Sequence, residues 1–392
     1  MPRGVSRRVS EVAPYLFSEI DKAEARARYR GIDVVKLSIG DPDLPSPPFI
    51  VAAMQKYVAD PKYHRYPPYE GTEYFRSNIR TYMRRRFDAD VPFENILCLV
   101  GAKEGLAHLA MGLLDPGDYS IHHEPAFPVP ASAATYNGAV IHYCPLKPEN
   151  AFLIDLDAIP AEVIAKARVI WVNYPNNPTG ATADRAFHER LLDFAARNDI
   201  WIVNDMAYSE NYYDPHKKPG SILAVPGAYD YAIEFHSFSK IFNMTGWRLG
   251  WCCGNKTLVD AVASIKSNHD TSQFGAMQDA ASEGLLRPEA EAWIHANNER
   301  MKARRDTVCK ALKECGINVK PPDATLYIWS PLPAGYADSI AFAAEILEKT
   351  GVVIAPGRAY GPSGEGFFRI SLTYPETQIE KGMARLKEYL GK

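Results

Sequence analysis

The sequence lacks three features, each of which would place it in a special class of proteins. No stretch approaches the ~18 consecutive uncharged apolar residues that a membrane-spanning helix needs. Cysteine is scarce, with six among 392 residues, and so few in a long chain are not expected to form a disulfide framework. Neither sign of charge dominates, because 44 basic residues stand against 47 acidic ones. We therefore expect no membrane contact and no binding of nucleic acid.

Further absences narrow the class of protein that is expected. No spacing of cysteine and histidine is typical of a zinc site, and no metal is expected. The basic start is followed by no apolar core with a small-residue cleavage site, so a secretory signal is not expected. The basic run from Arg84 to Arg86 is predicted to be a solvated helix face. With 46% hydrophobic and 23% charged residues, a cytoplasmic enzyme of ordinary composition is the simplest expectation.

The middle of the chain alternates short β-rich runs with helical segments. The runs are mostly unbroken apolar stretches, which is typical of strands covered on both faces. Between two of them, the residues Phe187, Leu191, Phe194 and Ala195 form one apolar helical stripe. Strands that alternate with helices predict a mainly parallel α/β sheet. The predicted strands are residues 95–101, 139–146, 167–175, 200–208 and 231–239.

The pattern changes after about Arg287. One long, charge-rich amphipathic helix is predicted up to Gly316, followed by strands within residues 325–332, 351–357 and 366–374 and a last helix. This is typical of a smaller α+β domain. Because a chain of 392 residues is too long for one simple core, we predict three parts: an N-terminal arm with part of the small domain (1–45), a large domain (46–286) and a small C-terminal domain (287–392).

Unusual polar residues stand where the predicted strands end. Asn177 follows one strand, Asp205 and Tyr208 end the next, and Lys240 follows a third. Each alone has an ordinary explanation, since Asn-Pro often forms a turn, aspartate often caps a helix and lysine is usually solvated. Together they indicate one pocket, because ligands bind at the carboxyl ends of such strands. Lys240 also stands in an apolar stretch, where an ammonium group is costly unless something neutralises it.

The order of these motifs resembles that of the class I and II aminotransferases of pyridoxal-phosphate fold type I. The resemblance rests on NPTG, D-x-A-Y and S-x-S-K, with an arginine eight residues beyond the lysine, and it extends over almost the whole chain. It is closest to the LL-diaminopimelate aminotransferases and their relatives, through PYLFSEI, LSIGDPDLPSP, YEG, GAKEGLAHL and GEGFFRISLT. It implies a large domain with a mainly parallel seven-stranded sheet and a smaller α+β domain.

The resemblance implies pyridoxal 5'-phosphate as the cofactor and assigns roles around its ring. Lys240 would bind the cofactor aldehyde covalently, which would neutralise the ammonium group, and the freed amine would later move a proton. Asp205 would pair with the pyridine nitrogen. Tyr208 and Asn177 would hydrogen-bond the phenolic oxygen. Phe127 would stack on the ring, at a position where many relatives have tyrosine.

The cofactor phosphate would need fixed positive potential. Ala102 and Lys103 would offer backbone N–H groups at a helix N-terminus, which is a ready anion site. Ser237 and Ser239 would add hydroxyl donors, and Arg248 would add a bidentate guanidinium group.

Substrate recognition is expected from Arg369, because an arginine in an apolar strand is costly unless it meets an anion. In the family this arginine binds the α-carboxylate, with the backbone of Gly40 opposite it and Asn177 nearby. Tyr15 matches a tyrosine that faces the substrate. Phe274 departs from the pattern, since some relatives have an asparagine there that reaches the distal end of the substrate from the partner subunit.

Tyr66 matches a tyrosine that the family donates across the subunit interface to the cofactor phosphate. The resemblance therefore implies a homodimer with shared active sites. The expected reaction passes an amino group between an amino acid and 2-oxoglutarate, with LL-diaminopimelate as the first candidate and lysine biosynthesis as the setting. The distal ammonium and carboxylate of that substrate would meet Tyr15, Lys103, Glu104 or residues of the other subunit.

Other functions stay open at this stage. Aspartate, alanine and aromatic aminotransferases share the fold and cofactor, and Phe274 would suit a shorter or more apolar substrate. A carbon–sulfur lyase is a further alternative, for a substrate with a leaving group on its β-carbon. A regulator built on this fold is disfavoured, because such proteins usually carry a DNA-binding domain and because the residues needed for turnover are all retained.

Overall fold

A seven-stranded sheet forms the centre of the molecule. The computed structural model describes residues 4, 6–11 and 16–391, so Tyr15 lies outside the described residues. Within the sheet, β8 runs antiparallel to its two neighbours, while the other strands run parallel to one another. The predicted mainly parallel α/β sheet is confirmed. Its order is β2 (Ile96–Leu99), β8 (Gly250–Gly254), β7 (Ala232–Ser237), β6 (Trp201–Asp205), β5 (Ala167–Asn173), β3 (Tyr119–Glu124) and β4 (Val140–Pro145).

All five predicted strands of this sheet are present, but the sequence analysis missed β3 and β8. Strand β3 carries polar residues that do not read as a buried strand, although Ser120, His122 and His123 are all buried. Their polar atoms are satisfied locally. The Ser120 hydroxyl accepts a hydrogen bond from the Trp171 indole at 2.9 Å, and His123 pairs with the Asn176 amide at 2.9 Å. Strand β8 is short and begins and ends with glycine, which has low β-propensity.

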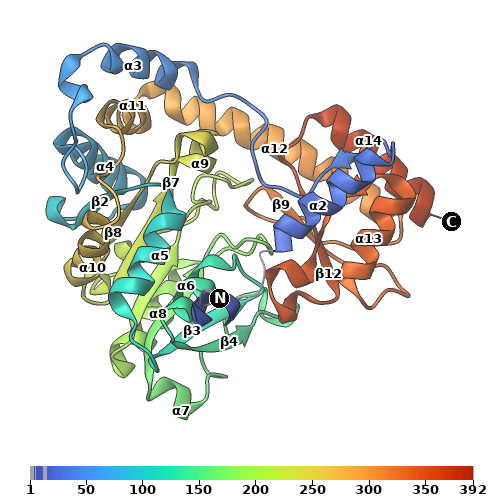
Figure 1. The fold of residues 1–392 in the computed structure, drawn as a ribbon, viewed down its shortest axis with the longest axis horizontal. Coiled ribbons are helices and arrows are strands. Elements are labelled where there is room, and N and C mark those ends of the chain that lie inside the picture. Colours follow the sequence, from blue (N-terminus) through green and yellow to red (C-terminus); the bar gives the residue numbers. More distant parts are fainter. Residues whose placement is uncertain (1–3, 5, 12–15, 392) are drawn as a thin grey trace.

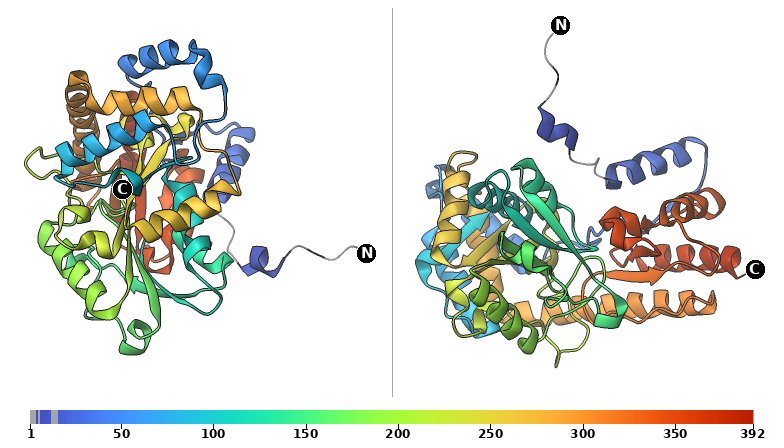
Figure 2. Two further views of the ribbon diagram at one scale, coloured as in Figure 1. Left: turned by 90° about the vertical axis from the view of Figure 1, so that its left-hand side faces the viewer. Right: turned by 90° about the horizontal axis from the view of Figure 1, so that it is seen from below.

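Helices pack on both faces of the sheet (Figures 1 and 2). Neighbouring strand residues contribute to opposite faces, because Ile202 belongs to one hydrophobic cluster and Val203 to another. The stripe predicted on α8 is buried along its length, which confirms that prediction. The helices of this part are α3 (Pro48–Val58), α4 (Glu73–Phe87), α5 (Ala102–Leu113), α6 (Val129–Tyr136), α7 (Ala161–Ile164), α8 (Arg185–Asn198), α9 (Phe238–Ile241), α10 (Lys256–Ser267) and α11 (Gly275–Leu286).

A smaller antiparallel sheet follows the long helix α12 (Pro288–Glu314), which the sequence predicted. After this helix the chain turns at Gly316, whose φ of 78° suits glycine. Figure 1 shows α12 reaching from the seven-stranded sheet to the smaller one. The smaller sheet has the order β11 (Ala355–Pro356), β12 (Phe367–Ser371) and β9 (Tyr327–Pro331), and the helices α13 (Ser339–Thr350) and α14 (Glu376–Leu390) belong to the same region.

Two elements of the N-terminal segment, α2 (Leu16–Tyr29) and β1 (Val35–Lys36), lie on this C-terminal region, where α2 contacts α13 and β1 pairs in parallel with β10 (Val352–Val353). Ion pairs reinforce the contact, among them Asp33 with Arg385 at 2.5 Å. Helix α1 (Arg7–Glu11) instead lies against α6 of the larger part (Figure 1). We propose that residues 16–45 belong with the small domain and that α1 is an arm on the large domain, in keeping with the N-terminal arm that the sequence suggested.

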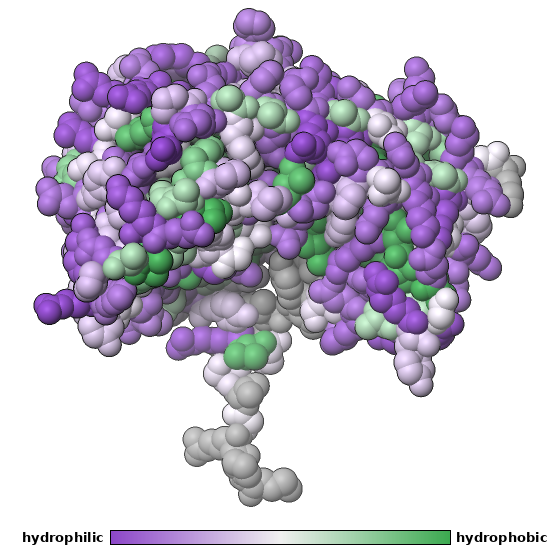
Figure 3. All heavy atoms as spheres, turned by 90° about the horizontal axis from the view of Figure 1, so that it is seen from above, coloured by the Kyte–Doolittle hydropathy of each residue, from purple (hydrophilic) through white to green (hydrophobic). Residues whose placement is uncertain are grey.

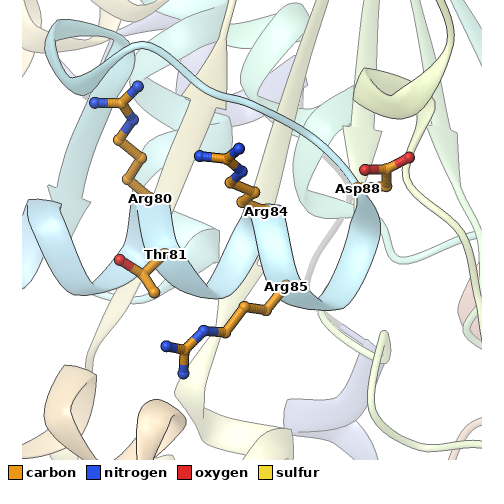
Figure 4. A pocket seen from close by; sticks show the side chains of 5 residues that line it. All are labelled: Arg80, Thr81, Arg84, Arg85 and Asp88. Carbon is orange, nitrogen blue, oxygen red and sulfur yellow. The ribbon is translucent and has the colours of Figure 1, made fainter.

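The surface is mixed in character. In Figure 3 hydrophobic patches alternate with hydrophilic residues. In the described parts of the chain, no helix combines the length and the apolar character of a membrane span. Figure 4 shows Arg80, Arg84 and Arg85 projecting from α4, as expected for a basic helix face. The prediction is wrong for Arg86, which turns inward and binds the buried Glu210 at 2.7 Å.

A buried arginine ties the segment after β1 to the C-terminal helices. Arg304 of α12 is 2% exposed, and its two terminal nitrogens lie 2.8 and 2.9 Å from the two carboxylate oxygens of Asp43. Its third nitrogen donates to Glu376 of α14 at 3.0 Å. Three segments that are distant in sequence therefore meet at one guanidinium group.

Replacing this arginine should destabilise the fold. The arginine is buried, while the side chains of Asp43 and Glu376 are 16% and 54% exposed. Arg304→Met therefore removes charge-assisted hydrogen bonds and leaves no buried carboxylate behind, so it should lower the unfolding free energy by about 2 kcal/mol in a urea titration followed by circular dichroism. Arg300→Met is the matched control, since Arg300 is exposed and lies 3.9 Å from the same Glu376, and it should change stability by less than about 0.5 kcal/mol. Equal effects of the two changes would contradict the assignment.

Candidate active site

A cavity of about 420 Å³ opens at the carboxyl ends of β5, β6 and β7. Its other wall comes from the smaller sheet, through Tyr327 of β9 and Arg369 of β12. The site residues predicted from the sequence line this cavity, apart from Tyr66, Tyr15 and the candidate Glu104. Tyr66 is 87% exposed and does not line it, and Tyr15 lies outside the described residues.

Lys240 enters the cavity from the short helix α9, directly after β7. Its Nζ atom donates to the Gly40 carbonyl. Burial lowers the pKa of Lys240, and the charges of Arg369 and Arg248 act in the same direction, against the opposing effects of Tyr327 and Asp41. A lysine with a lowered pKa yields a neutral amine more readily, and such an amine can act as a nucleophile and as a proton carrier.

Asp205 stands at the end of β6 and is 7% exposed. One carboxylate oxygen accepts the Ala207 N–H at 3.0 Å. Burial raises the pKa of Asp205 to about 6, against the lowering effect of that hydrogen bond. A cationic ligand would stabilise the ionised form of this buried carboxylate, and a protonated ring nitrogen is such a cation.

Asn173, which the sequence analysis missed, joins two of the strand ends. Its side-chain amide donates to the Asp205 backbone carbonyl at 2.7 Å, and its side-chain oxygen accepts the Asn177 N–H at 2.9 Å. The Asn177 side chain is thereby held beside the cavity. The signal in the sequence was the asparagine at the end of a predicted strand.

Groups that can bind an anion line the cavity at the N-terminus of α5. Helix α5 begins at Ala102 after Gly101, whose φ is 74°. A Cβ atom on Gly101 would lie 2.8 Å from a terminal nitrogen of Arg248, so only glycine lets the guanidinium group approach the helix N-terminus this closely. The hydroxyl groups of Ser237 and Ser239 lie in the same lining. A helix N-terminus, two hydroxyls and a guanidinium group together suit a phosphate.

Arg369 and Tyr327 form the wall that faces these strand ends. Arg369 is 2% exposed, and it donates to the Asn177 side-chain oxygen at 2.9 Å and to the Ser38 carbonyl at 2.5 Å. Its guanidinium carbon lies 3.8 Å from the centre of the Tyr327 ring. A planar guanidinium group held in this way is suited to bind a carboxylate.

Position 40 requires glycine, because the Tyr327 side chain lies very close to the backbone there. A Cβ atom at Gly40 would lie 1.9 Å from the Tyr327 hydroxyl oxygen. Neither the contact nor the presence of Tyr327 in the cavity could be predicted locally, because both depend on the pairing of β9 with β12. Asp21 of α2 also lines the cavity, and this could not be predicted locally either, because it depends on the packing of α2 against the C-terminal region.

Glu104 was a candidate for the distal end of a substrate, but it does not line the cavity. One of its oxygens accepts the Val100 N–H at 3.0 Å, and the other lies 2.6 Å from a ring nitrogen of His108. Glu104, His108 and Asp270 lie close enough to hold a metal ion. The ammonium group of Lys266 already occupies that position, at 3.5 Å from Glu104 and 2.7 Å from Asp270.

Comparison with known proteins gives a consistent picture. The family model for aminotransferase class I and II matches residues 32–386. The chain is 44% identical to an LL-diaminopimelate aminotransferase of Nitratidesulfovibrio vulgaris over 380 residues, which cover 97% of each chain. It is 42% identical to the enzyme of that name from Aquifex aeolicus over 383 residues, covering 97% of this chain and 98% of that protein.

Solved structures share the fold. Substrate-bound BacF from Bacillus subtilis superposes with a TM-score of 0.94 at 30% identity, covering 99% of this chain and 98% of that one. A double mutant of aspartate aminotransferase from Thermus thermophilus superposes with a TM-score of 0.92 at 28% identity, covering 99% and 100%. The fold class predicted from the sequence is confirmed.

The displaced pKa of Asp205 predicts a pH-dependent stability of the cofactor-free protein. The pKa is about 6 in the folded chain, against an ordinary value of 3.8. Ionisation therefore favours the unfolded state, and stability should fall as the pH rises from about 4 to about 6 and stay reduced above that. Asp205→Asn removes this cost, so the cofactor-free variant should be more stable than the wild type at pH 8, by about 3 kcal/mol.

The measurement is thermal or urea unfolding of the cofactor-free proteins at pH 4 and pH 8. The advantage of the Asn variant should be present at pH 8 and absent at pH 4. Asp157→Asn, at an exposed position, is the control and should show no such dependence. A variant that is less stable than the wild type at pH 8 would contradict the electrostatic argument.

Proposed function

Because the chain belongs to the class I and II aminotransferases, which depend on pyridoxal phosphate, we propose that it transfers an amino group from LL-diaminopimelate to 2-oxoglutarate. The membership confirms the family resemblance, the enzyme class and the cofactor that the sequence indicated. The choice of substrate is supported by one observation, which is the identity of 42–44% with LL-diaminopimelate aminotransferases over 97% of the chain.

The residues around the cavity fit the cofactor. When bound, pyridoxal phosphate supplies an electron-withdrawing ring that stabilises negative charge at the substrate α-carbon. Asp205 would keep the ring nitrogen protonated, and its raised pKa of about 6 marks a carboxylate that gains from a cationic neighbour. Ala102, Ser237, Ser239 and Arg248 would hold the phosphate through the N–H, hydroxyl and guanidinium donors described above.

Lys240 would anchor the cofactor through its amine and would move the proton of the substrate α-carbon once released. Its lowered pKa supports this role, because a proton carrier must both take up and release a proton near neutral pH. Tyr208 and Asn177 would donate hydrogen bonds to the phenolic oxygen of the ring. Phe127, which lines the cavity, would pack on the ring face.

Arg369 would bind the α-carboxylate of the amino acid. Its contacts with Asn177, Ser38 and Tyr327 hold the guanidinium plane in place, and its buried position strengthens an ionic interaction. The smaller sheet forms this side of the cavity through Tyr327 and Arg369. The chemistry therefore takes place between the two sheets.

LL-diaminopimelate carries a second ammonium and a second carboxylate at its distal end, and both need partners. Asp21 and Lys103 both line the cavity and carry opposite charges. Asp21 also pairs with Lys36 at 2.9 Å. We assign Asp21 to the distal ammonium and Lys103 to the distal carboxylate.

We further propose a homodimer with composite active sites in the cytoplasm. Arg248 is exposed in the single chain, so the phosphate end of the cavity lacks a cover. Exposed apolar and aromatic residues lie on α3, on α4 and shortly before α4 and α11, helices that pack together: Val51, Val58, Tyr66, Tyr69, Tyr74 and Phe274. A second copy would cover them and bring its Tyr66 to the phosphate. All six cysteines are free, which fits a reducing compartment.

Mixing defective chains tests the composite site. Lys240→Ala lacks the anchor and Tyr66→Ala lacks the residue lent to the partner, so each should be weakly active or inactive alone. In random hybrids half of the dimers contain one intact site, so activity should return to roughly a quarter of the wild type. Mixing Lys240→Ala with the double variant is the control and should restore nothing. A fully active monomer in light scattering would refute the proposal.

The substrate is tested by ranking kcat/KM for several amino acids with 2-oxoglutarate as acceptor. LL-Diaminopimelate should rank above aspartate, alanine and phenylalanine. Asp21→Asn should raise the KM for LL-diaminopimelate by about tenfold, because a charge-assisted hydrogen bond is lost. The KM for glutamate should stay within about twofold, since glutamate has no distal ammonium to interact with Asp21.

Glu24→Gln is the matched control for Asp21→Asn. Glu24 pairs with the same Lys36, at 2.8 Å, but it does not line the cavity, so its loss should leave both KM values unchanged. If LL-diaminopimelate is inert while aspartate or phenylalanine turns over well, the substrate proposal fails and the family assignment stands.

A further inference from the structure

Tyr327 has a position that neither the motifs nor the roles above explain. It is the first residue of β9 and pairs with Ser371 of β12, so it belongs to the smaller sheet. Its side chain is 3% exposed and reaches across the cavity to the end of β6. The hydroxyl group lies 2.8 Å from the hydroxyl group of Tyr208, and the two rings meet edge to face at 72°.

The charges around this hydrogen bond favour one of its two possible directions. Burial raises the pKa of Tyr208 well above its ordinary value, and Asp205 acts in the same direction. Burial would also raise the pKa of Tyr327, but the positive charges of Arg369 and Lys240 outweigh it, and the net pKa is lowered. A lowered pKa makes Tyr327 the favoured donor, and a Tyr208 hydroxyl that donates to the phenolic oxygen of the cofactor can only accept from Tyr327, 2.8 Å away.

A Tyr208 hydroxyl that accepts from Tyr327 has its own proton left to donate elsewhere. That proton would be available to the phenolic oxygen of the cofactor ring, which is the role proposed for Tyr208 above. The Tyr327 ring has a second contact, since the guanidinium carbon of Arg369 lies 3.8 Å from its centre. An aromatic face at this distance stabilises a cation and restricts its movement.

We propose that Tyr327 is a positioning residue that serves both halves of the site: its hydroxyl orients that of Tyr208 toward the cofactor, and its ring supports Arg369 at the carboxylate. The proposal rests on the proposed aminotransferase function. It also explains why Gly40 must be glycine, since a Cβ atom there would lie 1.9 Å from the Tyr327 hydroxyl oxygen and would displace it.

Two variants separate the two contacts. Tyr327→Phe keeps the ring and removes the hydroxyl, whereas Tyr327→Leu removes both. The first readout is the pH midpoint of the visible absorbance of the bound cofactor. Hydrogen bonds donated to the phenolic oxygen favour its anion, so their weakening in Tyr327→Phe should raise the midpoint by about half to one pH unit. Tyr213→Phe is the control, because it loses a buried hydroxyl that donates to the Thr325 carbonyl at 2.6 Å, outside the cavity.

A double-variant cycle tests whether the hydroxyl acts through Tyr208. In a Tyr208→Phe background, Tyr327→Phe should cause no further shift of the midpoint. The second readout is the KM for the amino-acid substrate. It should stay within about twofold in Tyr327→Phe and rise about five- to tenfold in Tyr327→Leu, which lacks the ring beneath Arg369.

The outcomes are distinguishable. A wild-type protein that shows no cofactor absorbance overturns the proposed function and this inference together. A wild type with the expected absorbance and a Tyr327→Phe variant with an unchanged midpoint overturns the inference alone. A shift that persists at full size in the Tyr208→Phe background shows that the hydroxyl does not act through Tyr208, and it overturns the positioning role.

Discussion

Three charged side chains, those of Lys240, Asp205 and Arg369, are withdrawn from water around one cavity. Removing a charge from water costs several kcal/mol unless hydrogen bonds or opposite charges replace the hydration. Arg369 receives such replacement from Asn177 and from the ring of Tyr327. The other two instead have pKa values displaced toward the neutral form, downward for the lysine and upward for the aspartate. In the proposed function, binding of the cofactor would reduce this cost, because its aldehyde would react with Lys240 and its protonated ring nitrogen would pair with Asp205.

The predictable part of the site is the part encoded close to the strand ends. Asn177, Asp205 and Lys240 lie within a few residues of the strands that carry them, and parallel strands bring their carboxyl ends to one edge, so a single pocket followed from the pattern. The specificity of the motifs then gave the family and the cofactor, which the comparisons confirm. The seven-stranded sheet was predicted in type, but β3 was missed because a strand can be buried with polar side chains when these satisfy one another.

The remaining residues are set by contacts between distant segments. Tyr327 reaches the cavity only because β9 pairs with β12 beside the larger sheet, and Asp21 only because α2 lies against the C-terminal region. Nothing within ten residues of Tyr327 marks it as part of a site, and Asp21 stands one residue beyond the PYLFSEI motif. Glu104 shows the opposite case. It follows Lys103 in the motif GAKEGLAHL, and yet its carboxylate contacts His108 and does not line the cavity. Distance along the chain is a poor guide wherever two sheets share a cavity.

The pairing of β1 with β10 has a consequence for the synthesis of the chain. Val35 pairs with Val352, so the partner strand leaves the ribosome only after roughly 300 further residues have been made. At about 5–20 residues per second, the early segment waits from roughly 15 seconds to a minute for its partner. During that time Leu37, which is fully buried in the finished molecule, has no partner strand beside it. The seven strands of the larger sheet are complete long before, at Gly254, so the nascent protein passes through a stage at which half of its active site is assembled and the other half is still being translated.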